Sequence, residues 1–220
     1  MKFTVITLFP DLVLNLKNYS VIGRALNKVA KIKTVNLRDF GLGHYQQVDD
    51  KPYGGGVGML LRADVAEKAI QAATKSKPKK SKVILMSADG KKFTQKLAEE
   101  YSQLDELIIF CGHYEGHDKR IESLVDEKVS VGDFVTSGGE LPAMLIIDAT
   151  TRLLRGALGC DESGAVESFA KIGDDRILEY PQYTRPYDFK GNKVPKVLLS
   201  GDPKKIALWQ KSKTRKSKLS

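Results

Sequence analysis

Segments with β-strand character alternate with segments of helical periodicity from the first residues of this chain. Phe3–Leu8 is an apolar, β-branched run closed by Pro10, and Leu12–Val29 carries apolar residues at helical spacing. Further strands are expected at 34–37, 83–86, 107–111 and 128–131, and further helices at 64–73 (capped by Asp64), 93–104, 117–125 and 141–154. Strands separated by helices predict an α/β fold with a mostly parallel, buried sheet.

Three irregular segments follow predicted strands. They are Arg38–Met59, Gly112–Asp118 and Gly132–Glu140. Open parallel sheets bind their ligands at the loops beyond the carboxyl ends of the strands. The sequence therefore predicts a binding site formed by these three segments.

The periodicity divides the chain into three parts. Residues 1–156 carry the strand–helix alternation, and residues 157–175 lose it and are expected to form a mobile linker. Residues 176–220 are expected to form a second, small domain, with a proline-rich aromatic segment and a final helix capped by Asp202 and Pro203. A domain of this size buries little core of its own.

Composition excludes several classes of protein. A hydrophobic share of 41% is typical of globular chains. The longest apolar runs, such as Leu107–Cys111, are far shorter than the ~20 residues of a membrane span. The N-terminal segment is interpreted as a strand, not a signal peptide. Two cysteines, Cys111 and Cys160, favour a reducing cytoplasm, and the three histidines lack metal-ligand spacing around them, so no metal site is predicted.

The net charge of +9 is concentrated in two lysine-rich runs, Lys75–Lys82 and Lys211–Lys218. Such runs favour polyanions, with nucleic acid first and an anionic membrane surface second. Two solvated surface segments are an equal alternative. The sequence shows no amphipathic helix with bulky apolar anchors that would support binding to a membrane surface.

The segment Ser130–Met144 places three glycines between a predicted strand and a predicted helix. Glycine lets the backbone approach a ligand closely, so free N–H groups could bind an adenine edge or a carboxylate. A tight strand–helix turn without a ligand explains the same pattern. The spacing is neither the dinucleotide fingerprint nor the phosphate loop.

The segment Cys111–Arg120 contains Glu115, which could hold a cationic group of a ligand. A βα loop with Asp118 as a helix cap explains it equally well.

The segment Val48–Met59 combines paired aspartates with four glycines. The aspartates suggest a metal or a base, and the glycines a loop over a ligand. A hairpin loop with solvated carboxylates is the alternative.

The segment Tyr180–Pro186, followed by Val194–Gly201, mixes aromatic, arginine and hydroxyl side chains that suit stacking and phosphate contact on RNA. Extended packing of a small domain is the alternative.

Taken together, these segments resemble the bacterial tRNA (guanine-N1)-methyltransferase family, the TrmD group of the SPOUT class. The resemblance extends from Phe9 to about Trp209 and includes, in order, DDKPYGGGVGM, CGHYEG, SVGDFVTSGGELPAM, YPQYTRP and VPKVLLSG. It implies a trefoil-knotted α/β domain, a homodimer and a small helical C-terminal domain that binds tRNA. It also implies methyl transfer from S-adenosylmethionine to N1 of guanine 37, with Mg²⁺ as a candidate second cofactor.

The resemblance assigns residues to each role. The cofactor positions are Ser87, Gly112, Tyr114, Glu115, Val131, Gly132, Asp133, Phe134, Val135, Thr136, Gly138 and Gly139. The tRNA positions are Asp49, Asp50, Tyr53, Gly54, Gly55, Tyr183 and Arg185.

Arg152 and Glu167 match the family's catalytic positions. Guanine N1 carries a proton at neutral pH, so a carboxylate must remove it while a cation stabilises charge on O6. The family has aspartate where this chain has Glu167, whose longer arm requires a different backbone position. The nearby alternative bases are Asp161, Glu162, Asp174 and Asp175.

Other departures concern the pocket wall and the C-terminal domain. Ala88 replaces the family's proline after Ser87, and Asp202 replaces a histidine. The competing hypothesis is a non-catalytic tRNA-binding protein that retains the knotted dimer scaffold, supported only by the Asp-to-Glu difference at 167.

Overall fold

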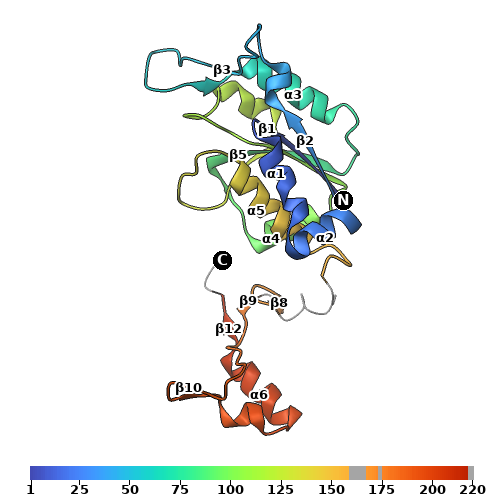
Figure 1. The fold of residues 1–220 in the computed structure, drawn as a ribbon, viewed down its shortest axis with the longest axis vertical. Coiled ribbons are helices and arrows are strands. Elements are labelled where there is room, and N and C mark those ends of the chain that lie inside the picture. The colour runs from blue at the N-terminus through green and yellow to red at the C-terminus, as the bar shows by residue number, and fades with distance from the viewer. Residues whose placement is uncertain (159–166, 173–174, 218–220) are drawn as a thin grey trace. The chain divides into compact units, whose positions relative to one another are not determined.

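The computed structural model describes residues 1–158, 167–172 and 175–217. The chain divides into two compact units, Met1–Gly159 and Cys160–Ser220 (Figure 1). Cys160 and three of the alternative bases, Asp161, Glu162 and Asp174, lie outside the described residues.

The first unit contains a five-stranded sheet whose paired strands are all parallel. Its order is β2 (Lys31–Asn36), β1 (Lys2–Thr7), β6 (Glu106–Phe110), β5 (Ser81–Lys92) and β7 (Glu127–Ser130). The predicted α/β class and parallel sheet are therefore confirmed, while the knot remains a prediction.

Helices cover both faces of this sheet. Side chains alternate along a strand, so Phe3 and Val5 of β1 pack into one apolar core and Ile6 into another. The first core includes α1 (Pro10–Leu14), α2 (Ser20–Lys28), α4 (Gln95–Ser102) and α5 (Glu140–Thr151). The second core includes α3 (Ala63–Thr74), which lies across the strands from α1 and α5 (Figure 1).

The single helix predicted over Leu12–Val29 is wrong. The chain forms α1, a 3₁₀ turn at Asn15–Asn18 and then α2, with Ser20 in the left-handed region at φ 54°. Gly23 lies so close to the preceding turn that a Cβ would stand 2.6 Å from the Lys17 carbonyl oxygen. Apolar spacing does not reveal this break because both short helices bury side chains in the same core.

Two other helix predictions need correction. Helix α3 begins at Ala63, so Asp64 lies in its first turn, where a carboxylate favours the positive end of the helix dipole, and pairs with Arg62 at 3.0 Å. The helix predicted at 117–125 is a 3₁₀ helix, Lys119–Leu124, whose first turn Asp118 caps as expected.

The second unit is built from short elements. Strands β8 (Lys171–Ile172), β9 (Asp175–Leu178) and β12 (Arg215–Lys216) form an antiparallel sheet, and β10 (Asp188–Phe189) pairs with β11 (Asn192–Lys193). A 3₁₀ turn at Lys196–Leu199 precedes α6 (Pro203–Lys213). The Asp202 cap of α6 is confirmed, because its carboxylate accepts hydrogen bonds from the backbone of Lys204 and Lys205.

Candidate active site

A cavity of about 410 Å³ opens at the carboxyl edge of the parallel sheet. Three chain segments form most of its wall: residues 86–89 of β5, the loop 112–119 after β6, and the loop from β7 to α5. This is the edge at which sheets of this class bind their ligands.

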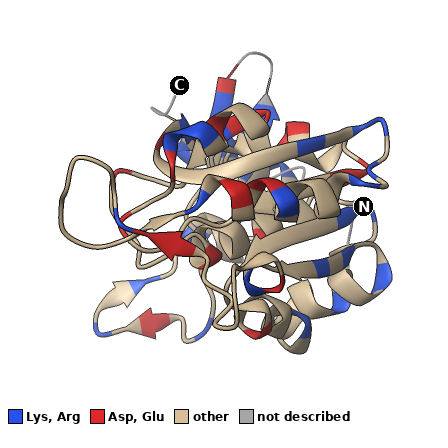
Figure 2. Ribbon diagram, turned by 90° about the horizontal axis from the view of Figure 1, so that it is seen from above, with Lys and Arg blue, Asp and Glu red and all other residues tan. Residues whose placement is uncertain are grey.

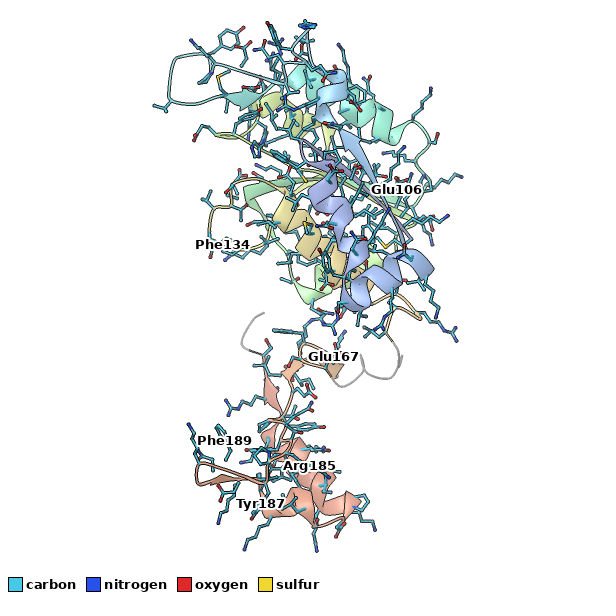
Figure 3. All side chains as sticks on the ribbon, viewed as in Figure 1. Glu106, Phe134, Glu167, Arg185, Tyr187 and Phe189 are labelled. Carbon is cyan, nitrogen blue, oxygen red and sulfur yellow. The ribbon has the colours of Figure 1, made fainter. Side chains whose placement is uncertain are left out.

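Eleven of the twelve predicted cofactor positions line this cavity. They are Ser87, Gly112, Tyr114, Glu115, Val131, Gly132, Phe134, Val135, Thr136, Gly138 and Gly139. Asp133 is the exception, because its exposed carboxylate turns to the Lys92 ammonium at 2.6 Å. Phe134 projects outward on the same loop (Figure 3).

Two backbone segments meet at the floor of the cavity. The Gly139 N–H donates to the Gly112 carbonyl oxygen at 2.7 Å. A Cβ on Gly139 would stand 2.8 Å from both the Cys111 Cα and the Gly112 nitrogen, closer than such atoms approach in proteins. Only glycine permits this approach, so the glycine-rich turn presents backbone to the cavity and suits a ligand that is recognised by backbone N–H and C=O groups.

A charged carboxylate that the sequence analysis missed lies at the cavity wall. Asp89 accepts hydrogen bonds from the Lys128 ammonium at 2.5 Å and the Ser87 hydroxyl at 2.6 Å. These two contacts lower the pKa of Asp89 to about 2. Its partner Lys128 comes from β7, and that pairing is invisible in the local sequence.

A buried polar group lies behind the glycine turn. Glu140, the first residue of α5, is 4% exposed and accepts a hydrogen bond from the Thr7 hydroxyl at 2.7 Å. Burial, and next the charge of Glu140, raise the pKa of the Cys111 thiol. Cys111 is a free cysteine and is buried, as its place at the end of an apolar run leads one to expect.

The paired aspartates lie on an antiparallel hairpin, β3 (Asp49–Asp50) and β4 (Leu60–Leu61). Strand β3 is wholly acidic (Figure 2). The Asp50 carboxylate pairs with the Arg62 guanidinium at 2.7 Å.

The connecting loop of this hairpin is rich in left-handed backbone. Gly54, Gly55, Gly56 and Gly58 all have positive φ, and Tyr53 is fully exposed. Such backbone favours glycine and explains the composition of the segment.

This hairpin adjoins the cavity. The Glu115 N–H donates to the Met59 carbonyl, and the Leu61 N–H donates to the Gly116 carbonyl. Burial raises the pKa of Tyr114, and the Asp49 carboxylate reinforces this while Arg38 opposes it. The structure thus brings the base of this hairpin, with the predicted tRNA position Asp49, beside the predicted cofactor positions Tyr114 and Glu115.

The two catalytic candidates belong to different units. Arg152 is exposed and caps the C-terminus of α5 in the first unit. Glu167 is partly exposed and begins a turn in the second unit, where its carbonyl accepts a hydrogen bond from Ala170 (Figure 3). Asp175, an alternative base, pairs with Lys216 at 2.5 Å.

The remaining predicted tRNA positions, Tyr183 and Arg185, also lie in the second unit. Tyr183 is 49% exposed, and its ring centroid lies 6.2 Å from that of Trp209. Arg185 is exposed on the segment that leads into β10 (Figure 3).

Within residues 1–158, 167–172 and 175–217, no group of three or more His, Cys, Asp or Glu side chains could hold a metal ion. None of the helices in the described part of the chain has the length and apolar character needed to cross a membrane.

Residues 1–219 match the family model of the tRNA (guanine-1)-methyltransferase TrmD. The chain belongs to this family. Its relatives include tRNA (guanine-N(1)-)-methyltransferases of Carboxydothermus hydrogenoformans, 47% identical over 97% of this chain and 83% of the relative, and of Lactobacillus johnsonii, 49% identical over 96% and 84%. The enzyme of that name from Lactobacillus helveticus is 47% identical over 99% and 87%. The resemblance seen in the sequence is therefore confirmed along nearly the whole chain.

Proposed function

We propose that this protein transfers the methyl group of S-adenosylmethionine to N1 of guanine 37 in tRNA, next to the anticodon. The observation that carries this proposal is the cavity at the sheet edge, which gathers eleven predicted cofactor positions in a member of the TrmD family. Nothing in the described residues or among the named relatives favours a non-catalytic RNA-binding protein.

The cavity suits the methyl donor. Backbone groups of Gly112 and of residues 131–139 would hold the adenosine part, and the Glu115 carboxylate would hold the cationic methionine end. When bound, S-adenosylmethionine supplies a methyl group activated by a positive sulfur. The glycine contacts at the cavity floor exclude side chains and leave this backbone accessible.

The acid–base chemistry belongs to Arg152 and Glu167. Guanine N1 is a poor nucleophile until it loses its proton, so the Glu167 carboxylate accepts that proton as N1 takes the methyl group. The Arg152 guanidinium stabilises the negative charge that develops on O6. Mg²⁺, the candidate second cofactor, is titrated in the assay.

The tRNA contacts come from both units. Asp49, Asp50, Tyr53, Gly54 and Gly55 lie on the hairpin beside the cavity, and the net charge of +9 favours a polyanion. Tyr183 and Arg185 add contacts from the second unit. In this proposal, residues 1–156 are the knotted cofactor domain, 157–175 the linker and 176–220 the tRNA-binding domain of a cytoplasmic enzyme.

Exposed apolar side chains on α5 and the glycine-rich loop support a homodimer. Leu141 and Leu145, one helical turn apart, are 59% and 48% exposed, and Phe134 and Val135 of the loop are 59% and 89% exposed. Apolar side chains gathered like this mark an association surface. A second copy of the chain would bury them.

Methyl transfer from labelled S-adenosylmethionine to a tRNA transcript tests the proposal, with Mg²⁺ titrated and a transcript lacking guanine 37 as the control. We expect label at that guanine alone, and its absence with folded dimeric protein would refute the function. The variants Arg152→Ala and Glu167→Ala should bind the cofactor in calorimetry but lose turnover. Retained turnover in Glu167→Ala would point to another base, such as Asp175.

A further inference from the structure

The second unit separates its aromatic side chains into two groups. Tyr180 and Tyr183 lie around Trp209, with ring centroids 6.4 Å and 6.2 Å from the indole. Among the described residues, Tyr187 and Phe189 contact no other aromatic ring, and they are 46% and 61% exposed. The first pair packs against Trp209, whereas the second pair presents much of its ring surface to solvent.

Tyr187 and Phe189 lie on one face of the β10–β11 hairpin. Asp188 and Phe189 pair with Lys193 and Asn192, and the Val194 N–H extends the ladder by donating to the Tyr187 carbonyl at 3.0 Å. Residues two apart on a strand point to the same side. The intervening Asp188 pairs with Lys193 at 3.8 Å on the opposite side.

The surroundings of this aromatic face are basic. Residues 185–196 contain the cations Arg185, Lys190, Lys193 and Lys196 and a single carboxylate, Asp188. The Lys190 ammonium lies 5.6 Å from the centre of the Phe189 ring. Arg185, Tyr187 and Phe189 follow one another along the exposed segment into the hairpin (Figure 3).

We propose that Tyr187 and Phe189 form a stacking platform for unpaired nucleotides of the RNA substrate, with Arg185 and Lys190 contacting the adjoining phosphates. Exposed aromatic rings flanked by cations are what binding of single-stranded nucleic acid requires, because every base has a face that can stack and every linkage carries a negative charge. Ordered duplex offers only phosphates to such a surface, since its bases are already stacked. The platform rests on the proposed function, and it specifies that the second unit reads unpaired nucleotides.

The test measures binding of the full-length protein to a tRNA transcript and to a fully paired, blunt-ended RNA duplex with the same total number of nucleotides. Phe189→Leu keeps an apolar side chain but removes the ring, and should weaken binding to tRNA roughly fivefold or more while leaving binding to the paired duplex unaffected. Phe189→Trp keeps an aromatic ring at this position and should bind tRNA at least as tightly as the wild type. Leu208→Ala, which removes an equally exposed apolar side chain from α6, is the matched control and should change neither.

Salt dependence separates stacking from phosphate contact. Lys190→Gln should reduce the slope of log K against log salt by about one unit, whereas Phe189→Leu should lower K without changing the slope. Equal tRNA binding by wild type and Phe189→Leu would overturn the platform, as would equal weakening of binding to tRNA and to the paired duplex. The platform would also be overturned if Phe189→Leu dissociated an oligomer that the wild type forms. The aromatic face would then bind a second copy of the chain and not RNA. Failure of methyl transfer to guanine 37 by the wild type would instead contradict the proposed function. Methyl transfer is measured in a separate assay from RNA binding, so the two failures can be told apart.

Discussion

Gly139→Ala tests whether the cavity floor depends on contact between two backbone segments. Gly139 has φ −77° and ψ −6°, a conformation that alanine adopts freely, so the substitution introduces no backbone strain. Its Cβ would stand 2.8 Å from the Cys111 Cα and the Gly112 nitrogen, both main-chain atoms of the end of the sheet. Relief therefore requires the α5 turn to move away from the loop after β6.

The size of the effect follows from two contributions. Overpacking a close-packed site costs about 1–3 kcal/mol. Separating the segments also lengthens the 2.7 Å hydrogen bond from Gly139 to Gly112, which costs about 1 kcal/mol more. The sum of about 2–4 kcal/mol should lower the melting temperature of a chain of this size by roughly 4–16 °C.

Gly112→Ala is the matched control, because it adds the same methyl group to the neighbouring glycine. The nearest atom to its Cβ, the Met86 carbonyl oxygen, lies at an ordinary 3.5 Å. Thermal unfolding should show a change of less than about 1 kcal/mol for this variant. Calorimetry should show weaker S-adenosylmethionine binding by Gly139→Ala. Equal melting temperatures for the two variants would refute the reasoning.

Three further predictions concern stability, association and reactivity. Burial alone would raise the pKa of Glu127, but hydrogen bonds from Tyr101 and Lys82 outweigh it and lower that pKa below the ordinary 4.5. The carboxylate therefore stabilises the fold above pH 4.5 and loses this effect as pH falls through the folded-state pKa, so Glu127→Gln should cost about 1–3 kcal/mol in urea unfolding at pH 7 and progressively less as the pH falls below 4.5. Leu145→Glu should convert the proposed dimer to monomer in sedimentation, and an unchanged dimer would exclude this surface. Because burial raises the pKa of Cys111, peptide mass spectrometry should find it unmodified by iodoacetamide in the native protein at pH 8 and modified in urea.

The strands and the two-sided burial of the sheet could be predicted because they depend on local pattern. Phe3, Val5 and Ile6 alternate between two cores, as the apolar run at the N-terminus indicates. The order of strands across the sheet could not be predicted, because it depends on which distant segments pair. The break at Ser20 escaped prediction for a related reason, since Gly23 fits against the preceding turn and not against a local motif.

The candidate site shows the same division. Its glycine-rich segments were recognisable, whereas the contacts that fix them were not. Glu140 ends an irregular segment in the sequence pattern, but the structure makes it the first residue of α5, and its hydrogen-bond partner is Thr7 of β1. Asp89 likewise depends on Lys128 of another strand. Side chains of this kind become recognisable only when the fold brings their partners together.

The aromatic residues of the second unit show why composition alone left two readings open. Tyr183 contacts Trp209, whereas Phe189, further along the chain, has a cation over its ring and most of its surface exposed. Tyr183 therefore combines packing with its proposed tRNA contact, whereas Tyr187 and Phe189 expose their rings. It follows that the proposed stacking platform can be altered without loss of fold, whereas the cavity, whose floor is backbone in mutual contact, cannot. Substitutions of the exposed rings in the β10–β11 hairpin should accordingly change RNA affinity alone. Substitution of Gly139 should change stability and cofactor binding together.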